Sequence, residues 1–131
     1  MAASSGALHE PGDQLRAETV ERHRATVSLM EELEAIDWYD QRIDASSDEA
    51  LRRVLAHNRD EEKEHAAMAL EWLRRHDAAL DGFLGAYLFS DGGIAERAEE
   101  LEGEERGEGD GPGGASGDAG GSLGIGSLRA R

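Results

Sequence analysis

Cysteine is missing from the 131-residue sequence, and basic residues are scarce. Without cysteine the chain can form no disulfide, thiolate nucleophile, iron–sulfur cluster or thiolate zinc site, so any metal must be held by oxygen and nitrogen. Lys and Arg number 14 against 29 Asp and Glu, which gives a formal net charge of -15. Because this charge repels phosphate backbones, we expect no nucleic-acid partner. An acidic surface instead concentrates cations.

Long apolar runs are also missing. Nowhere are there about 18 consecutive apolar residues, the length that a membrane-spanning helix needs. The first residues, Met1 to Ser5, lack the basic start and apolar run of a secretory signal. We therefore expect no membrane partner and a cytoplasmic protein.

Residues able to build a core lie between positions 13 and 91, which predicts one helical domain. Residues 1–12 have the composition of a flexible N-terminal arm. Residues 92–121 are acidic and Gly-rich, as in a flexible linker, with at most a weak helix over 94–102. Residues 122–131 then bring back three aliphatic side chains, Leu123, Ile125 and Leu128. A domain this small is marginal alone, so we expect metal binding or self-association to stabilise it.

Two long helices dominate the predicted domain. No Gly or Pro occurs from Leu15 to Asp44, and apolar residues recur there with helical spacing, which predicts a first helix capped by Asp13. Ser46 and Glu49 have the spacing of a capping box at the start of a second helix.

The second helix should run to about Arg75. A connection as short as the one between these helices makes them antiparallel neighbours. A shorter third helix should follow and end at Gly92–Gly93. The predicted fold class is thus all-α: an antiparallel two-helix hairpin plus a short third helix.

Three side chains suggest a metal site. Glu62 and His65 are one helical turn apart, so their Cβ atoms lie roughly 5–6 Å apart and both can reach one ion. Glu32, on the first helix, interrupts a face of small and apolar residues. A carboxylate aimed at packing costs several kcal/mol if it has no partner, and a multivalent cation relieves that cost.

These three residues are half of a known ligand set. Di-iron carboxylate bundles use a lone Glu from each of two helices and a Glu-x-x-His pair from each of two others. A second copy of the chain, related by a twofold axis, would complete a four-helix bundle and a site for two iron ions. Anionic oxygen ligands favour ferric iron, so such a site should promote oxidation by dioxygen.

The same residues allow other interpretations. Lys63 and Arg59 could pair with the acids and leave a solvated face on a metal-free scaffold. Alternatively, the ligands could hold Zn(II) or Mn(II) in a non-catalytic adaptor that uses the ion to fix a dimer. The remaining helical histidines, His23, His57 and His76, are expected at the surface or at a helix end.

Four neighbours of Glu32 are further candidates. Trp38 and Tyr39 are expected to pack, and Tyr39 has the right offset to hydrogen-bond a metal ligand. Glu31 and Glu34 most simply face water. On a dimer axis, however, four such carboxylates could converge and attract incoming iron.

Two segments, SLMEELEAIDWY (28–39) and HNRDEEKEHA (57–66), closely resemble the encapsulated ferritins. The likeness covers about residues 8–91 and includes Tyr87-Leu88-Phe89. The terminal SLGIGSLR (122–129) is similar to the peptides that load cargo into encapsulin nanocompartments.

This resemblance implies a ferroxidase that acts within an encapsulin shell, where the oxidised iron is stored. Paired subunits would share the di-iron site, and the pairs would join into a ring-shaped decamer. The resemblance implies that Glu32, Glu62 and His65 are the ligands, with Trp38 and Tyr39 near them. It also implies that iron enters at Glu31 and Glu34, and that the terminal peptide binds the shell through Leu123, Ile125 and Leu128.

Overall fold

The computed structural model describes residues 6–107, and its regular elements are all helical. They form two units, one ending at Asp77 and the other beginning at Ala78. The first holds the short 3-10 helix η1 (Gly12–Gln14) and the long helices α2 (Ala17–Ala45) and α3 (Glu49–Arg75). The second holds α4 (Ala78–Tyr87) and α5 (Ile94–Gly107). The predicted all-α fold class is confirmed.

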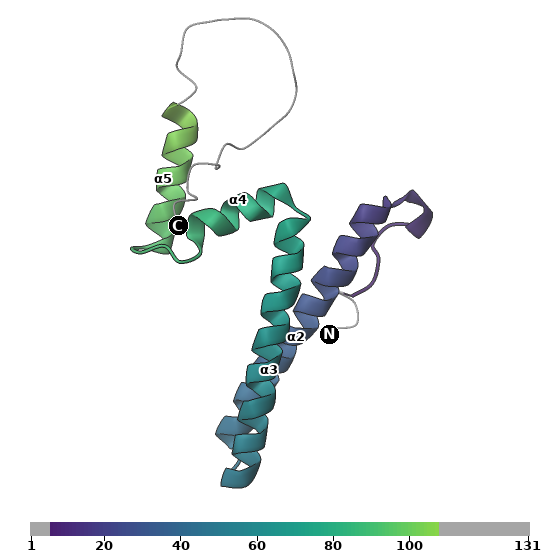
Figure 1. Cartoon of the computed structure of the whole chain (residues 1–131), viewed down its shortest axis with the longest axis vertical. Helices are drawn as coiled ribbons and strands as arrows, with labels where there is room; N and C mark the ends of the chain where they lie inside the picture. The colour runs from purple at the N-terminus through teal and green to yellow at the C-terminus, as the bar shows by residue number, and fades with distance from the viewer. Residues whose placement is uncertain (1–5, 108–131) are drawn as a thin grey trace, which may run out of the picture. The chain divides into compact units, whose positions relative to one another are not determined.

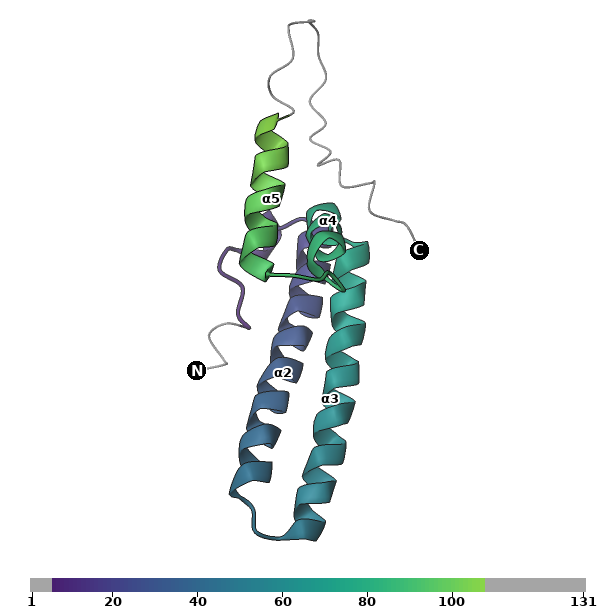
Figure 2. The same ribbon diagram turned by 90° about the vertical axis from the view of Figure 1, so that its left-hand side faces the viewer.

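Helices α2 and α3 run antiparallel along each other and are joined at one end by a tight turn (Figures 1 and 2). Neither helix contains Gly or Pro, so the backbone ladder is uninterrupted. The last turn of α3 carries Arg74 and Arg75, whose charges suit the carbonyl end of the helix dipole. The hairpin predicted from the sequence is therefore present.

The residues that start the two helices differ from those expected. Asp48, not the Ser46–Glu49 pair, caps α3, because its carboxylate accepts hydrogen bonds from the amides of Ala50 and Leu51 at 3.0 and 3.2 Å. A carboxylate already placed to take both free amides leaves the Ser46 hydroxyl to accept only the Asp48 amide, at 3.2 Å.

The predicted Asp13 cap of the first helix is also wrong. Asp13 belongs to η1, which a backbone hydrogen bond from Gln14 to Pro11 closes. The chain is then extended at Arg16, the residue that precedes α2, and no side chain caps the helix there. Residues 6–11 form no helix or strand, and Gly6 lies close to Val27 of α2.

The hairpin buries few side chains of its own. Within its described residues, only Ala66 and Leu73 are buried, and both belong to α3. Large apolar side chains stay exposed on both helices: Met30, Leu33, Trp38, Leu51, Val54 and Met68. Such a surface needs a covering partner to be stable in water.

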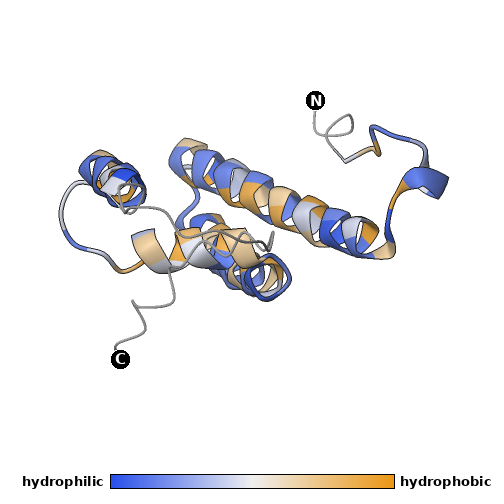
Figure 3. Ribbon diagram, turned by 90° about the horizontal axis from the view of Figure 1, so that it is seen from above, coloured by the Kyte–Doolittle hydropathy of each residue, from blue (hydrophilic) through white to orange (hydrophobic). Residues whose placement is uncertain are grey.

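The second unit departs from the prediction at both helices. Helix α4 is mostly apolar (Figure 3) and ends at Tyr87, several residues before the glycines expected to stop it. The chain turns instead at Phe89, whose φ of 59° is left-handed. A full helix, α5, follows from Ile94 to Gly107, where we expected linker with at most a weak helix.

Helix α5 is fastened to α4 by Arg97. Its Nε donates to the carbonyl of Ala86 at 3.3 Å, and its Nη1 pairs with Glu100 at 3.1 Å. The Arg97 side chain thus provides a hydrogen-bond donor for a backbone oxygen near the end of α4. The composition of residues 94–107 does not reveal this contact. Within residues 6–107, no helix is both long enough and apolar enough to cross a membrane.

Candidate metal centre

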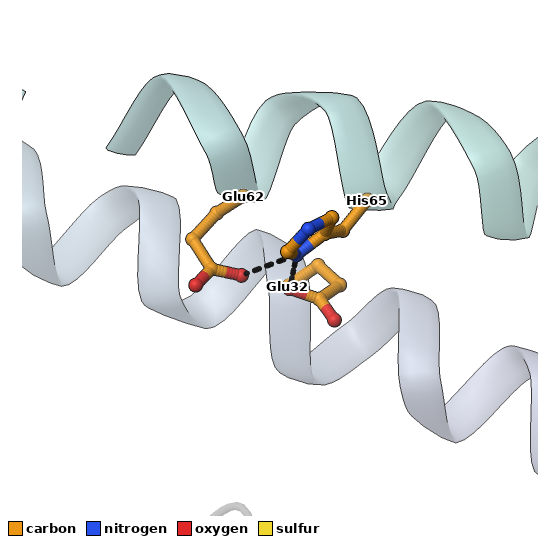
Figure 4. A group of neighbouring side chains, drawn as sticks. All are labelled: Glu32, Glu62 and His65. Carbon is orange, nitrogen blue, oxygen red and sulfur yellow. Dashed lines mark ion pairs between the residues drawn. The ribbon is translucent and has the colours of Figure 1, made fainter. Parts of the chain in front are cut away.

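Glu32, Glu62 and His65 come together in the middle of the hairpin, as the sequence predicted. Glu32 is on α2, and the other two are one turn apart on α3 (Figure 4). The Nδ1 atom of His65 lies 3.7 Å from Oε2 of Glu32 and 3.5 Å from Oε2 of Glu62. Each residue offers one donor atom, and the three atoms lie within 4.8 Å of one another. One ion could contact all three after small side-chain rotations.

The two carboxylates are placed where their charges repel. Their side chains are only 25% and 24% exposed, whereas that of His65 is 52% exposed. A hydrogen bond to Glu62 is the main cause that raises the pKa of Glu32 above its usual range, and burial adds to it. Nearby His65 opposes the shift but does not cancel it. A cation bound here would favour the ionised form of Glu32 and neutralise the charge of both acids.

The chemistry of the donor set fits iron. Two carboxylate oxygens and an imidazole nitrogen suit Fe(II), Mn(II) and Zn(II), and anionic oxygen favours the ferric state. No other group of three or more His, Asp and Glu within residues 6–107 brings its donor atoms this close. The site holds only half of the ligands that a two-ion carboxylate centre uses.

Two cations that could have neutralised these acids lie elsewhere. Arg59 donates to Asp40 at 3.0 Å and to Asp60 at 3.1 Å, while Lys63 is 3.7 Å from Asp60. The interpretation in which Arg59 and Lys63 pair with the site's carboxylates is therefore wrong. Among residues 6–107, the acids at the site keep only His65 as an ion-pair partner.

A groove of about 460 Å³ opens beside Glu32 and His65. Small and apolar side chains form most of its wall: Ala25, Ser28, Met68, Ala69 and Trp72. Met68 was not among the predicted site residues, although its position three residues after His65 places it on the same side of α3. This side chain is 65% exposed. The site thus borders an open, largely apolar surface.

The other predicted residues surround the centre without entering it. Glu31 is exposed and, through its charge, adds slightly to the raised pKa of Glu32, while Glu34 is half-buried. The guanidinium of Arg42 lies 5.9 Å from the Trp38 ring and 5.5 Å from the Tyr39 ring. In the described chain Tyr39 contacts Arg42 rather than a ligand, and its predicted hydrogen bond stays a prediction.

Two of the remaining histidines have partners outside the centre. His57 pairs with Glu61 at 3.1 Å, and its side chain is 73% exposed. The ring of His76 stacks on Trp72 with the ring centroids 3.8 Å apart. His57 therefore lies at the surface and His76 caps the end of α3, as expected.

Comparison with known proteins identifies the fold to which this hairpin belongs. Residues 7–91 match the family described as EncFtn-like. The chain belongs to the EncFtn-like family. The structure resembles the crystal structure of protein NE0167 from Nitrosomonas europaea, with 56% sequence identity and a TM-score of 0.66. That match covers 68% of this chain and 98% of the other.

Curated relatives of this EncFtn-like chain agree with the family assignment. The encapsulated ferritin-like protein of Rhodospirillum rubrum is 61% identical over 130 residues, covering 98% of this chain and 92% of the relative. The ferritin-like protein of Thermotoga maritima is 50% identical over 95 residues, which cover 72% and 83% of the two chains. The encapsulin nanocompartment cargo protein EncC of Myxococcus xanthus is 34% identical over 83 residues, covering 60% and 64%. The predicted resemblance to encapsulated ferritins is confirmed.

Proposed function

We propose that this EncFtn-like protein is a ferroxidase that oxidises Fe(II) with dioxygen at a site shared by two subunits. The convergence of Glu32, Glu62 and His65 on one point of the hairpin carries the proposal. Two copies related by a twofold axis would supply four carboxylates and two imidazoles, the full set for two ions. Four ionised carboxylates balance the charge of two Fe(II) ions, and each ion loses one electron to dioxygen.

The exposed surface beside the site supports pairing of subunits. His65 remains half exposed although its carboxylate neighbours are mostly covered. Met68, one turn after His65, and Val54, three turns before it, are 65% and 56% exposed on the same side of α3. A second hairpin laid against this side would cover apolar area and complete the ligand set together.

The remaining proposals concern assembly and location. Pairs of subunits would join into a ring-shaped decamer, with iron entering near Glu31 and Glu34. We place the protein inside an encapsulin shell in the cytoplasm, because named relatives are an encapsulated ferritin-like protein and an encapsulin cargo protein. Leu123, Ile125 and Leu128 would bind the shell; they lie outside the described residues.

Oxygen uptake on adding Fe(II) tests the proposal. Wild type should consume dioxygen, and Glu32→Ala should reduce the rate to that of buffer when compared at the same oligomeric state. Asp44→Ala, which removes an exposed acid further along α2, should behave as wild type. Iron binding by the wild type without oxygen uptake would instead identify a non-catalytic metal-binding adaptor.

A further inference from the structure

Arg59 links the two long helices one turn before Glu62, toward the turn that joins the helices. Its Nη1 donates to Asp40 of α2 at 3.0 Å, and its Nε donates to Asp60 of α3 at 3.1 Å. The Arg59 side chain is only 25% exposed, against 53% for Asp40 and 63% for Asp60. The hydrogen bond to Asp40 is the main cause that raises the pKa of Arg59, and Arg59 lowers the pKa of Asp60. The Arg59 guanidinium and the Asp60 carboxylate therefore both stay charged at neutral pH.

The direction of this contact follows from helix geometry. Helical side chains lean toward the N-terminus of their own helix, and in the antiparallel hairpin that end of α3 lies beside the end of α2 that carries Asp40. Arg59 is one turn before Glu62, whereas Asp40 is eight residues after Glu32, or about 12 Å along the axis. The ion pair is thus a second connection between the helices, displaced along them from the site.

Apolar packing only weakly fixes the position of α2 along the axis of α3. Only Ala66 and Leu73 are buried among the described residues of the hairpin, and no large side chain is fully buried. Metal–ligand distances tolerate errors of about 0.2 Å, while one residue of helix rises about 1.5 Å. A slide of a fraction of a residue would separate Glu32 from Glu62 and His65.

We infer that Arg59 is a positioning residue, which holds Asp40 and thereby sets the height at which Glu32 faces Glu62 and His65. The inference rests on the proposed function, because the site it serves is the proposed two-metal centre. Within residues 6–107, no hydrogen bond or ion pair joins Arg59 or Asp40 to the three site residues, so their effect must travel through the placement of α2 on α3.

Mn(II) binding to the full chain tests this role without using turnover. Arg59→Gln and Asp40→Asn should each weaken Mn(II) binding about tenfold and reduce the electron paramagnetic resonance signal of exchange-coupled ion pairs. The exchanged pair, Asp40→Arg with Arg59→Asp, should restore both. Arg53→Gln is the matched control, since it removes an ion pair of 3.5 Å to Glu49 within α3 alone. Urea unfolding of all variants shows whether their stabilities match.

The outcomes distinguish the positioning role of Arg59 from the two-metal centre. If wild type binds coupled ions and Arg59→Gln does so equally well, the positioning role is refuted while the two-metal centre stands. If wild type binds only isolated ions but Arg59→Gln still weakens them more than Arg53→Gln does, the positioning role stands and the two-metal centre fails. Equal losses in Arg59→Gln and Arg53→Gln, or no recovery in the exchanged pair, would overturn the positioning role. If wild type binds no Mn(II), both proposals are overturned.

Discussion

Truncating Met68 should weaken the pairing of subunits without touching a metal ligand. Met68 borders the groove beside His65 and is 65% exposed in the single chain. Full burial of a Met side chain is worth about 1.5–3 kcal/mol, so the part still exposed leaves about 1–2 kcal/mol for an interface. Met68→Ala keeps the Cβ atom, which reduces the loss to about 1 kcal/mol per chain. Because both subunits of a twofold pair carry the substitution, the pair loses about 2 kcal/mol of binding free energy. Its dissociation constant should therefore rise roughly 30-fold.

Sedimentation equilibrium of the metal-free protein measures this constant directly. Leu33→Ala is the matched control, because Leu33 is also exposed, at 54%. Leu33 lies on α2 two turns before Asp40, so it is on the same side of that helix as the residue that pairs with Arg59. It should leave the monomer–dimer constant near that of wild type. If Met68→Ala pairs as tightly as Leu33→Ala, the side of the hairpin that carries His65 is not the surface where subunits meet.

Three further predictions concern the acids, the tail and the helix start. Because Glu32 has a raised pKa, the metal-free chain should lose stability as pH rises from the usual carboxyl pKa through the raised one. Glu32→Gln should remove this loss and raise the melting temperature at neutral pH. Calorimetry of the same variant should show weaker Mn(II) binding. Deleting residues 122–131 should abolish loading into encapsulin shells in a co-purification assay and leave oxygen uptake unchanged; equal loading would refute a targeting role. Asp48→Ala should cost about 1 kcal/mol of unfolding free energy, because the amides of Ala50 and Leu51 lose their acceptor, and an unchanged urea midpoint would contradict that cap.

The helices and the convergence of Glu32, Glu62 and His65 could be predicted because each depends on spacing along one helix or on one facing pair. The absence of Gly and Pro from α2 and α3 leaves few alternatives to a helix, and a short connection makes the two antiparallel. The spacing of Glu62 and His65 is fixed by the helical turn. Only the height of Glu32 against them needed the tertiary structure, and the three donor atoms do converge.

The cap of α3 and the end of α4 were predicted wrongly because neighbouring residues with similar local preferences compete for these positions. Asp48 and Ser46 are both good caps, and only the path of the turn decides which one reaches the free amides. Helix α4 ends before its glycines because Phe89 turns the chain first. The partner of Arg59 could not be read from α3 alone, since Asp40 lies nineteen positions away on another helix.

The weak core and the incomplete site have one physical explanation. A hairpin that buries only Ala66 and Leu73 among its described residues gains little from folding alone, and its exposed apolar side chains raise the cost of remaining single. The two carboxylates add a further cost, because the hydrogen bond to Glu62, burial and the nearby charge of Glu62 all raise the pKa of Glu32. Pairing would cover the apolar side chains, and metal would neutralise the acids, so each event lowers the cost of the other. Added Mn(II) should therefore tighten the subunit pair, and the pair should bind Mn(II) more tightly than the single chain by the same factor.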